Sequence, residues 1–209
     1  MVTISKTTTT NQIKSRKRVT ERGEVFTAER EVKAMLDLVK PETERIDSRF
    51  LEPACGNGNF LIEILRRKLD WAKQMLTRWH PCKYDDIMAD LSLRAVSSIY
   101  GIDIMADNVE ESRERMYIEL CDWFRNTSKH VDLRRGIVSR VPSKELIAAW
   151  HHILKLNIQQ GDFLTMQHPE TKEPLKVYQW NIDGQKIEYA DYLLSDLVNG
   201  SEPRQLMLW

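Results

Sequence analysis

The fold of this chain is decided by Phe50-Leu-Glu-Pro-Ala-Cys-Gly-Asn-Gly-Asn-Phe60. A short apolar run opens this stretch, two closely spaced glycines break it, and Leu61, Ile64 and Leu65 follow at the spacing of one helix face. Glycine readily takes the backbone angles that a tight turn after a strand requires. The pattern therefore predicts a strand at 50–52, a glycine-rich loop and a helix that begins near residue 60.

Two further apolar stretches repeat this combination of strand and helix on the C-terminal side of the loop. Residues 98–102 precede a helix-forming segment that begins near Asp107, and residues 156–160 follow another helix-forming segment. Strands that alternate with helices are typical of a parallel sheet. We expect an α/β protein in which one sheet holds three parallel strands, at 50–52, 98–102 and 156–160, and helices cover both faces of it.

The C-terminal part of the chain has a different pattern. Residues 177–180 and 186–189 alternate in polarity and flank Asp183-Gly184, a dipeptide that strongly favours a two-residue turn. This pattern predicts a β-hairpin over about 175–190. A sheet of three parallel strands has an open edge, and covering that edge is one role for the hairpin.

Length and composition favour one domain with an N-terminal arm. Of the 209 residues, 42% are hydrophobic and 30% are charged, which is typical of a globular chain. Residues 1–20 hold four consecutive threonines and the basic residues Lys14, Arg16, Lys17 and Arg18. We expect a disordered basic arm at 1–20 and one domain at 21–209. The arm could contact phosphates, but its composition alone favours a solvated tail.

Charge and cysteine content exclude several classes of function. Lys+Arg and Asp+Glu both count 31, so no field of the whole molecule attracts nucleic acid, and any DNA contact must use a local patch. No apolar run approaches the ~18 residues of a spanning helix, and no signal peptide is evident. The three cysteines form no CxxC pair, which argues against a zinc site or a disulfide framework. We expect a cytoplasmic protein without a membrane anchor or a metal.

Polar residues follow each of the three predicted strands. Glu52, Asp103 and Asp162 would meet at one edge, because the carboxyl ends of parallel strands lie together. Glycines let a ligand approach the backbone closely, and carboxylates suit ribose hydroxyls and an exocyclic amine. The ligand should therefore resemble adenosine.

The glycine loop does not match the common phosphate-binding loops. Leu61 stands where a dinucleotide fingerprint has its third glycine, and Asp103 lies far beyond the ~20-residue spacing of the acid in that fingerprint. Glu52 would repel a pyrophosphate but would attract a cationic ligand. A sulfonium nucleoside fits these residues better than a dinucleotide does.

At this point the chain resembles a known family. Residues 50–60 resemble motif I of S-adenosylmethionine-dependent DNA methyltransferases, and Gly23-Glu-Val-Phe-Thr27 resembles the "FTP" motif, with Ala28 in place of proline. Residues 100–104 resemble motif II, and Gly161-Asp-Phe163 resembles motif III. This order is similar to that in the adenine-N6 methylases of type I and fused type II restriction-modification systems. The resemblance implies a Rossmann-like methyltransferase sheet, of which strands 1–3 are present.

The resemblance also implies a role for each matched residue. Phe26 and Thr27 would contact the methionine part of the cofactor, and Glu52 would lie near its amine. Pro53 and Cys55 belong to the same loop, in which Gly56 and Gly58 would give the cofactor room. Asp103 would hold the ribose hydroxyls and Ile104 would lie against the adenine, while Asp162 would accept from the adenine amine and Phe163 would flank the ring. The ordinary alternatives are helix caps or solvated loop positions for the acids and core packing for Phe163.

The chain also departs from the family. Adenine-N6 methylases place an Asn or Asp, two prolines and an aromatic residue after strand 4, where they hold the flipped target base. This chain has no Pro-Pro pair, and too few residues follow Asp162 for strands 4 to 7 and a target recognition domain. Two hypotheses stay open, and the catalytic residues stay unassigned. One is an S-adenosylmethionine-binding DNA adenine methylase of a restriction-modification or phage-defence system. The other is a non-catalytic module that binds cofactor, DNA or a partner subunit that carries the missing loop.

Overall fold

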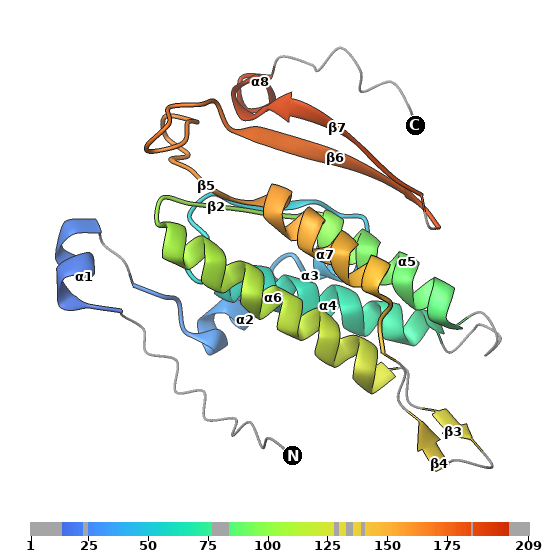
Figure 1. The fold of residues 1–209 in the computed structure, drawn as a ribbon. Coiled ribbons are helices and arrows are strands. Elements are labelled where there is room, and N and C mark those ends of the chain that lie inside the picture. The colour runs from blue at the N-terminus through green and yellow to red at the C-terminus, as the bar shows by residue number, and fades with distance from the viewer. Residues whose placement is uncertain are drawn as a thin grey trace.

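One parallel sheet of three short strands organises the protein (Figure 1). The computed structural model describes residues 14–22, 25–76, 84–127, 130–132, 136–138, 141–184 and 186–200. The strands are β1 (Phe50–Glu52), β2 (Ile99–Asp103) and β5 (Ile158–Gln160), and they lie in the order β1-β2-β5. Both neighbouring pairs are parallel. The three predicted strands and their parallel arrangement are confirmed.

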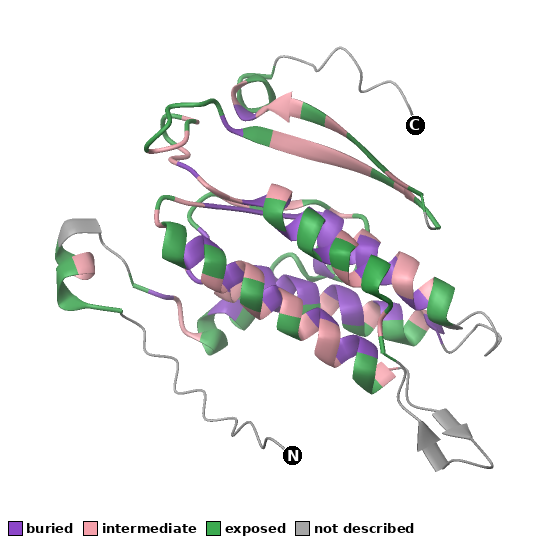
Figure 2. Ribbon diagram, viewed as in Figure 1, coloured by how far each residue is buried: buried purple, intermediate pink, exposed green. Residues whose placement is uncertain are grey.

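Two of the helices between the strands pack side by side on one face of this sheet. The sheet and six of the described helices form the body of the protein, and these helices are α2 (Glu29–Asp37), α3 (Lys40–Thr43), α4 (Asn59–Leu76), α5 (Tyr84–Ser97), α6 (Ala106–Thr127) and α7 (Lys144–Asn157). Figure 1 shows α4 and α6 below the sheet, and Figure 2 shows that their buried positions face inward. Gly101 of β2 lies so close to Leu61 of α4 that an added Cβ would come within 2.7 Å of its side chain.

The prediction of helices on both faces is wrong. The opposite face of the sheet is covered by the hairpin of β6 (Lys176–Asp183) and β7 (Lys186–Leu193), which leads into the short helix α8 (Leu194–Val198). The strand order explains this result. Because β1, β2 and β5 follow one another in a single direction and crossovers are right-handed, α4 and α6 lie on the same face, while α5 and α7 also contact the hairpin. The hairpin occupies the face of the sheet on which the second layer of helices was predicted.

The predicted hairpin is thus confirmed, but it covers a face of the sheet and not the open edge. The Tyr100 hydroxyl, on β2, donates a hydrogen bond to the Tyr178 carbonyl of β6 at 2.6 Å. Next to this bond, Ile102 of β2 packs with Leu175 and Leu194 in a small buried cluster. In the described part of the chain, no strand pairs with the outer edge of β1.

Asn157, which is 1% exposed, joins the hairpin to the body. Its side-chain amide donates to the Ser97 carbonyl at 3.1 Å and to the Ile99 carbonyl at 3.0 Å, where α5 passes into β2. Its amide oxygen accepts from the indole N–H of Trp180 on β6 at 2.8 Å. A single buried side chain therefore connects α7, the start of β2 and the hairpin.

The segment before the body is also structured in part. Residues 16–20 belong to helix α1 (Arg16–Arg22), so the prediction of disorder is wrong for these positions; residues 1–13 lie outside the described residues. The reason is a set of ion pairs that the sequence does not reveal, since they join this segment to α6.

A second antiparallel pair of strands, β3 (His130–Asp132) with β4 (Gly136–Val138), was not predicted from the sequence. Among the described helices, none is both long enough and apolar enough to cross a membrane.

Candidate functional site

The loops after the three parallel strands meet at one edge of the sheet. The backbone N–H of Gly56, in the loop after β1, donates to Asp103 Oδ2 at 2.9 Å, and the N–H of Gly161, after β5, donates to the Asp103 carbonyl at 2.9 Å. The N–H of Cys55 donates to the Ile102 carbonyl at 2.9 Å. The structure thus brings the glycine loop and the residues that resemble motifs II and III into direct contact.

Both glycines of the loop have backbone angles that other residues rarely adopt. The φ angle is +54° at Gly56 and +87° at Gly58. A Cβ on Gly58 would lie 2.9 Å from Ser112 Oγ of α6, and a Cβ on Gly56 would lie 3.2 Å from the ring of Phe26. The protein itself therefore uses the space that these glycines leave, and any ligand must share that space with Phe26 and Ser112.

Phe26 and Thr27 lie on the glycine loop, although about 30 residues separate them from it in the sequence. Phe26 is 7% exposed and its ring faces Gly56. The Thr27 carbonyl accepts a hydrogen bond from the side-chain amide of Asn59, the first residue of α4, at 2.9 Å. The segment that resembles the FTP motif and the loop that resembles motif I form one surface.

Glu52 is a half-buried carboxylate at the end of β1. Burial raises the pKa of its carboxyl group, and only a backbone hydrogen bond at Ala54 opposes this shift. Within the described ranges, no ion pair involves Glu52. A carboxylate that has lost part of its hydration and gained no cation is a site where a positively charged group would be stabilised.

The neighbouring residues of the loop are less suited to bind a charged ligand. Pro53 is exposed. Cys55 is buried, and this burial raises the pKa of its thiol to about 12, so it stays protonated at neutral pH. Its side chain lies under Gly101, where an added Cβ would come within 3.1 Å of the sulfur. Cys55 therefore acts by packing.

Asp103, at the end of β2, already accepts three hydrogen bonds from the protein. Oδ2 accepts from Gly56 N–H, and Oδ1 accepts from Met105 N–H at 2.8 Å and from the side-chain amide of Asn108 at 3.2 Å. A carboxylate offers about four acceptor positions. One position, on Oδ2, is therefore left for a ligand. This arrangement suits one ribose hydroxyl and not two.

The residues after β5 have clear roles within the protein. Asp162 Oδ1 accepts from the N–H of Leu164 at 2.9 Å, which is a typical turn contact. Phe163 packs against the cluster of Ile102, Leu175 and Leu194 on the hairpin side of the sheet. Ile104, which would lie against the adenine, is 38% exposed, and its carbonyl accepts from the Gln160 side chain at 3.2 Å. Of these three residues, Ile104 offers the most free surface.

The structure adds residues that the sequence analysis did not assign. Asn57 is 6% exposed, its amide nitrogen donates to Glu111 of α6 at 3.0 Å, and its amide oxygen is buried with no hydrogen-bond partner in the described part of the chain. Such an oxygen is a place where a water or a ligand N–H would bind. No local pattern in the sequence marks Asn57 in this way, because its partner Glu111 lies 54 residues further along the chain.

The predicted basic arm contacts this same part of α6. Arg18 and Lys14 both pair with Asp107, and Lys14 also pairs with Glu111. The hydrogen bond from Arg18 holds the pKa of Asp107 well below its usual range. Two of the four basic residues of the arm are therefore engaged within the protein, which weakens the case for phosphate contacts by the arm.

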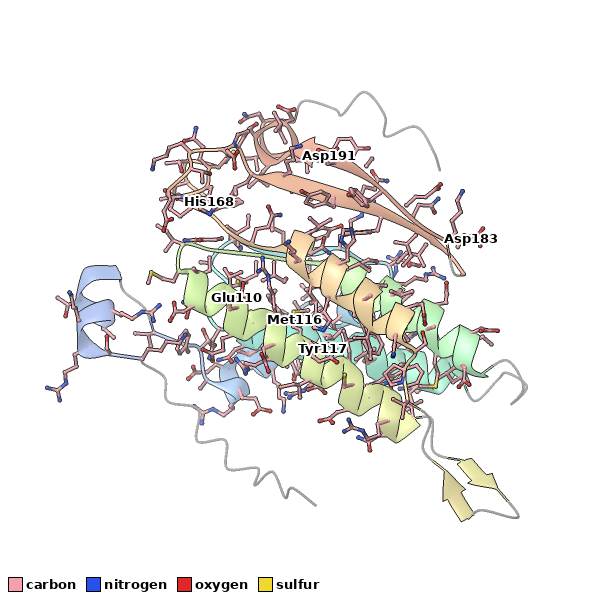
Figure 3. The ribbon with its side chains drawn as sticks, in the orientation of Figure 1. Glu110, Met116, Tyr117, His168, Asp183 and Asp191 are labelled. Atoms are coloured by element: carbon pink, nitrogen blue, oxygen red, sulfur yellow. The ribbon has the colours of Figure 1, made fainter. Side chains whose placement is uncertain are left out.

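A separate cavity of about 350 Å³ lies between α6, β5 and the loop that joins β5 to β6. Figure 3 labels two of its lining residues, Glu110 on α6 and His168 on the loop. None of the predicted site residues lines it. His168 Nδ1 accepts from the N–H groups of Glu170 and Thr171, so it serves the loop, and Arg113 donates to the Lys155 and Ile158 carbonyls.

In the described ranges, no group of three or more His, Cys, Asp or Glu residues could hold a metal ion. The chain was also compared with known proteins. No protein-family model, no curated protein and no solved structure matches this chain significantly.

Proposed function

We propose that the loops at the carboxyl edge of β1, β2 and β5 form a crevice that binds S-adenosylmethionine, and that the protein is of the DNA adenine-N6 methyltransferase type with a partial Rossmann-like sheet. One observation carries this proposal. Segments that are far apart in the sequence and resemble the family's motifs lie together, since Phe26 faces Gly56 and Asp103 accepts from the N–H of Gly56. Parallel strands already bring Asp103 to the glycine loop, but the order of the sequence does not require that Phe26 lies there as well.

The residues of the crevice fit the charges of this cofactor. S-adenosylmethionine carries a sulfonium and an ammonium group, and Glu52 is a half-buried carboxylate with no cation beside it in the described part of the molecule. The amide oxygen of Asn57 is a second acceptor without a donor. When bound, the cofactor supplies a methyl group that is transferred to an amine lone pair. The protein's task is then to hold and orient the two reactants.

A second candidate function rests on the open edge of the sheet. Leu51, the middle residue of β1, is 41% exposed, and β1 pairs only with β2 among the described strands. An unpaired strand edge readily accepts a further strand. The same protein could therefore be a non-catalytic module whose sheet is completed by a partner subunit that carries the catalytic loop.

Calorimetric titration with S-adenosylmethionine and S-adenosylhomocysteine tests the cofactor. We expect both to bind, and we expect Asp103→Ala to weaken binding by about tenfold or more, because a hydrogen bond to a charged group contributes about 1.5–3 kcal/mol. Asp122→Ala, at the far end of α6, is the matched control and should bind like wild type. Circular dichroism must first show that each variant is folded. Absence of binding at millimolar ligand would refute the proposal.

A methylation assay separates the two candidates. The isolated chain is incubated with varied duplex DNA and labelled cofactor, and N6-methyladenine is measured in the digested DNA. Product formed by the isolated chain excludes the non-catalytic module. Cofactor binding without product, followed by product when a partner subunit is added, favours the module.

A further inference from the structure

We infer that residues 14–22 form a strap that closes the cofactor crevice and that Asp107 and Glu111 of α6 are its latch. This inference rests on the proposed function, because it concerns access to the same crevice. It assigns a role to the basic segment that neither phosphate binding nor a solvated tail explains.

The latch consists of charge-assisted hydrogen bonds. Arg18 makes a two-pronged contact with Asp107, from Nη1 to Oδ2 at 2.6 Å and from Nη2 to Oδ1 at 2.9 Å. Lys14 Nζ reaches Glu111 at 2.7 Å, the side-chain oxygen of Asn108 at 2.8 Å and Asp107 at 3.2 Å. Paired arginine and carboxylate groups in this geometry have a defined orientation.

The strap lies directly against residues of the crevice. Asn108, which accepts from Lys14, is the same residue whose amide donates to Asp103. Lys14 Nζ also lies 6.0 Å from the centre of the Phe26 ring, which in turn faces Gly56. Figure 1 shows α1 beside the end of α6 that starts next to Asp103. The strap therefore lies against residues that contact the proposed cofactor-binding residues Asp103 and Gly56.

The contacts that hold the strap to α6 are weak enough for it to open. None of residues 14–20 is buried, so no apolar anchor at these positions holds the segment to the body. Helix α1 has seven residues, which is too short for a helix to be stable without tertiary contacts. Lys14 and Arg18 hold the segment to α6 through ion pairs with Asp107 and Glu111, and partly exposed ion pairs are weak and are screened by salt. A closed and an open state can thus exchange, and both entry and exit of the cofactor depend on opening.

The experiment compares the full chain with the latch variant Asp107→Asn/Glu111→Gln. Both substitutions keep size and leave Glu111's position able to accept from Asn57, but they remove the charges that hold Lys14 and Arg18. Asp122→Asn is the matched control, because Asp122 is also on α6 and pairs with Arg125 near its other end. Two quantities are measured for each protein. They are the rate of trypsin cleavage within residues 14–22, read by mass spectrometry, and the association and dissociation rates of S-adenosylhomocysteine, read by stopped-flow tryptophan fluorescence.

We expect the latch variant to be cleaved about fivefold faster than wild type, because two partly exposed charge contacts are lost. Association and dissociation of S-adenosylhomocysteine should both accelerate by a similar factor, so that the dissociation constant changes little. High salt should produce the same acceleration in wild type and in the control, but not in the latch variant.

The possible failures are distinguishable. If the latch variant is cleaved no faster than the control, the latch does not exist and the inference is overturned. If cleavage accelerates but the ligand rates stay equal, the strap does not gate the crevice and the inference is overturned while the proposed function stands. If wild type binds no S-adenosylhomocysteine at all, the proposed function fails and the gate falls with it.

Discussion

Asp103 and Glu52 end neighbouring strands, yet their surroundings differ. Asp103 is surrounded by three N–H donors that join the glycine loop to the start of α6. Glu52 is half-buried, and burial raises the pKa of its carboxyl group. Asp103 therefore joins two loops, whereas Glu52 is partly desolvated and has no cation beside it among the described residues.

Glu52→Gln should make the ligand-free protein more stable at neutral pH and should weaken cofactor binding. Because the folded pKa of Glu52 is raised above its unfolded value, its favourable contribution is present below the unfolded pKa of ~4.3 and is lost as pH rises through the folded pKa. The substitution removes that loss. Urea unfolding between pH 4 and 8 should show an advantage of the variant at pH 7 that shrinks as the pH falls. Glu114→Gln, at an exposed position on α6, is the control, and a less stable Glu52→Gln would contradict the argument.

The residues of the crevice could be predicted only in part. The spacing of Gly56, Gly58 and Asp103 along the chain was enough to predict that they meet, because parallel strands align their ends. The partners of Asp103 could not be predicted, since backbone donors depend on the exact path of two loops. The pairs of Lys14 and Arg18 join segments about 90 residues apart, and no local pattern in the sequence reveals such contacts.

At the scale of elements, strands were more predictable than their packing. Short apolar runs marked β1, β2 and β5, and Asp183-Gly184 marked the hairpin. The sequence did not reveal which face of the sheet the helices cover and which face the hairpin covers. A sequence pattern gives the order of strands along the chain and not their order in the sheet. Once that order is β1-β2-β5, the handedness of crossovers places α4 and α6 on the same face.

Asn157→Leu should loosen the hairpin more than the rest of the fold. The substitution leaves the Ser97 and Ile99 carbonyls and the Trp180 indole N–H without their partner, and each buried unpaired group costs about 1–3 kcal/mol. Hydrogen exchange should accelerate first in β6 and β7, with a smaller change in α4. Asn181→Leu, at an exposed position on β6, is the control. Equal acceleration in β6, β7 and α4 would show that the hairpin does not open separately.

At the scale of the whole molecule, Cys55 should report global unfolding. It is 6% exposed, and burial raises the pKa of its thiol to about 12, whereas Cys121 is partly exposed. Iodoacetamide should label Cys121 in the native protein and Cys55 only when the chain unfolds. S-adenosylhomocysteine at 100 times its dissociation constant should slow labelling of Cys55 about 100-fold, because it stabilises the fold by about 2.7 kcal/mol. Peptide mapping measures both sites, and rapid native labelling of Cys55 would show that the glycine loop opens locally.

The placement of the hairpin on one face of the sheet also bears on how the protein is made. During translation, β1, β2 and β5 with their helices leave the ribosome before residues 176–193 do. Until the hairpin folds, the face of the sheet that carries Tyr100 and Ile102 is uncovered. In the folded protein the hairpin covers this face, and only 5% of Tyr100 and 3% of Ile102 are exposed. A nascent chain in this state would expose a hydrophobic face to which chaperones or other nascent chains could bind. The hairpin, which is synthesised after the three parallel strands, covers this face when it folds.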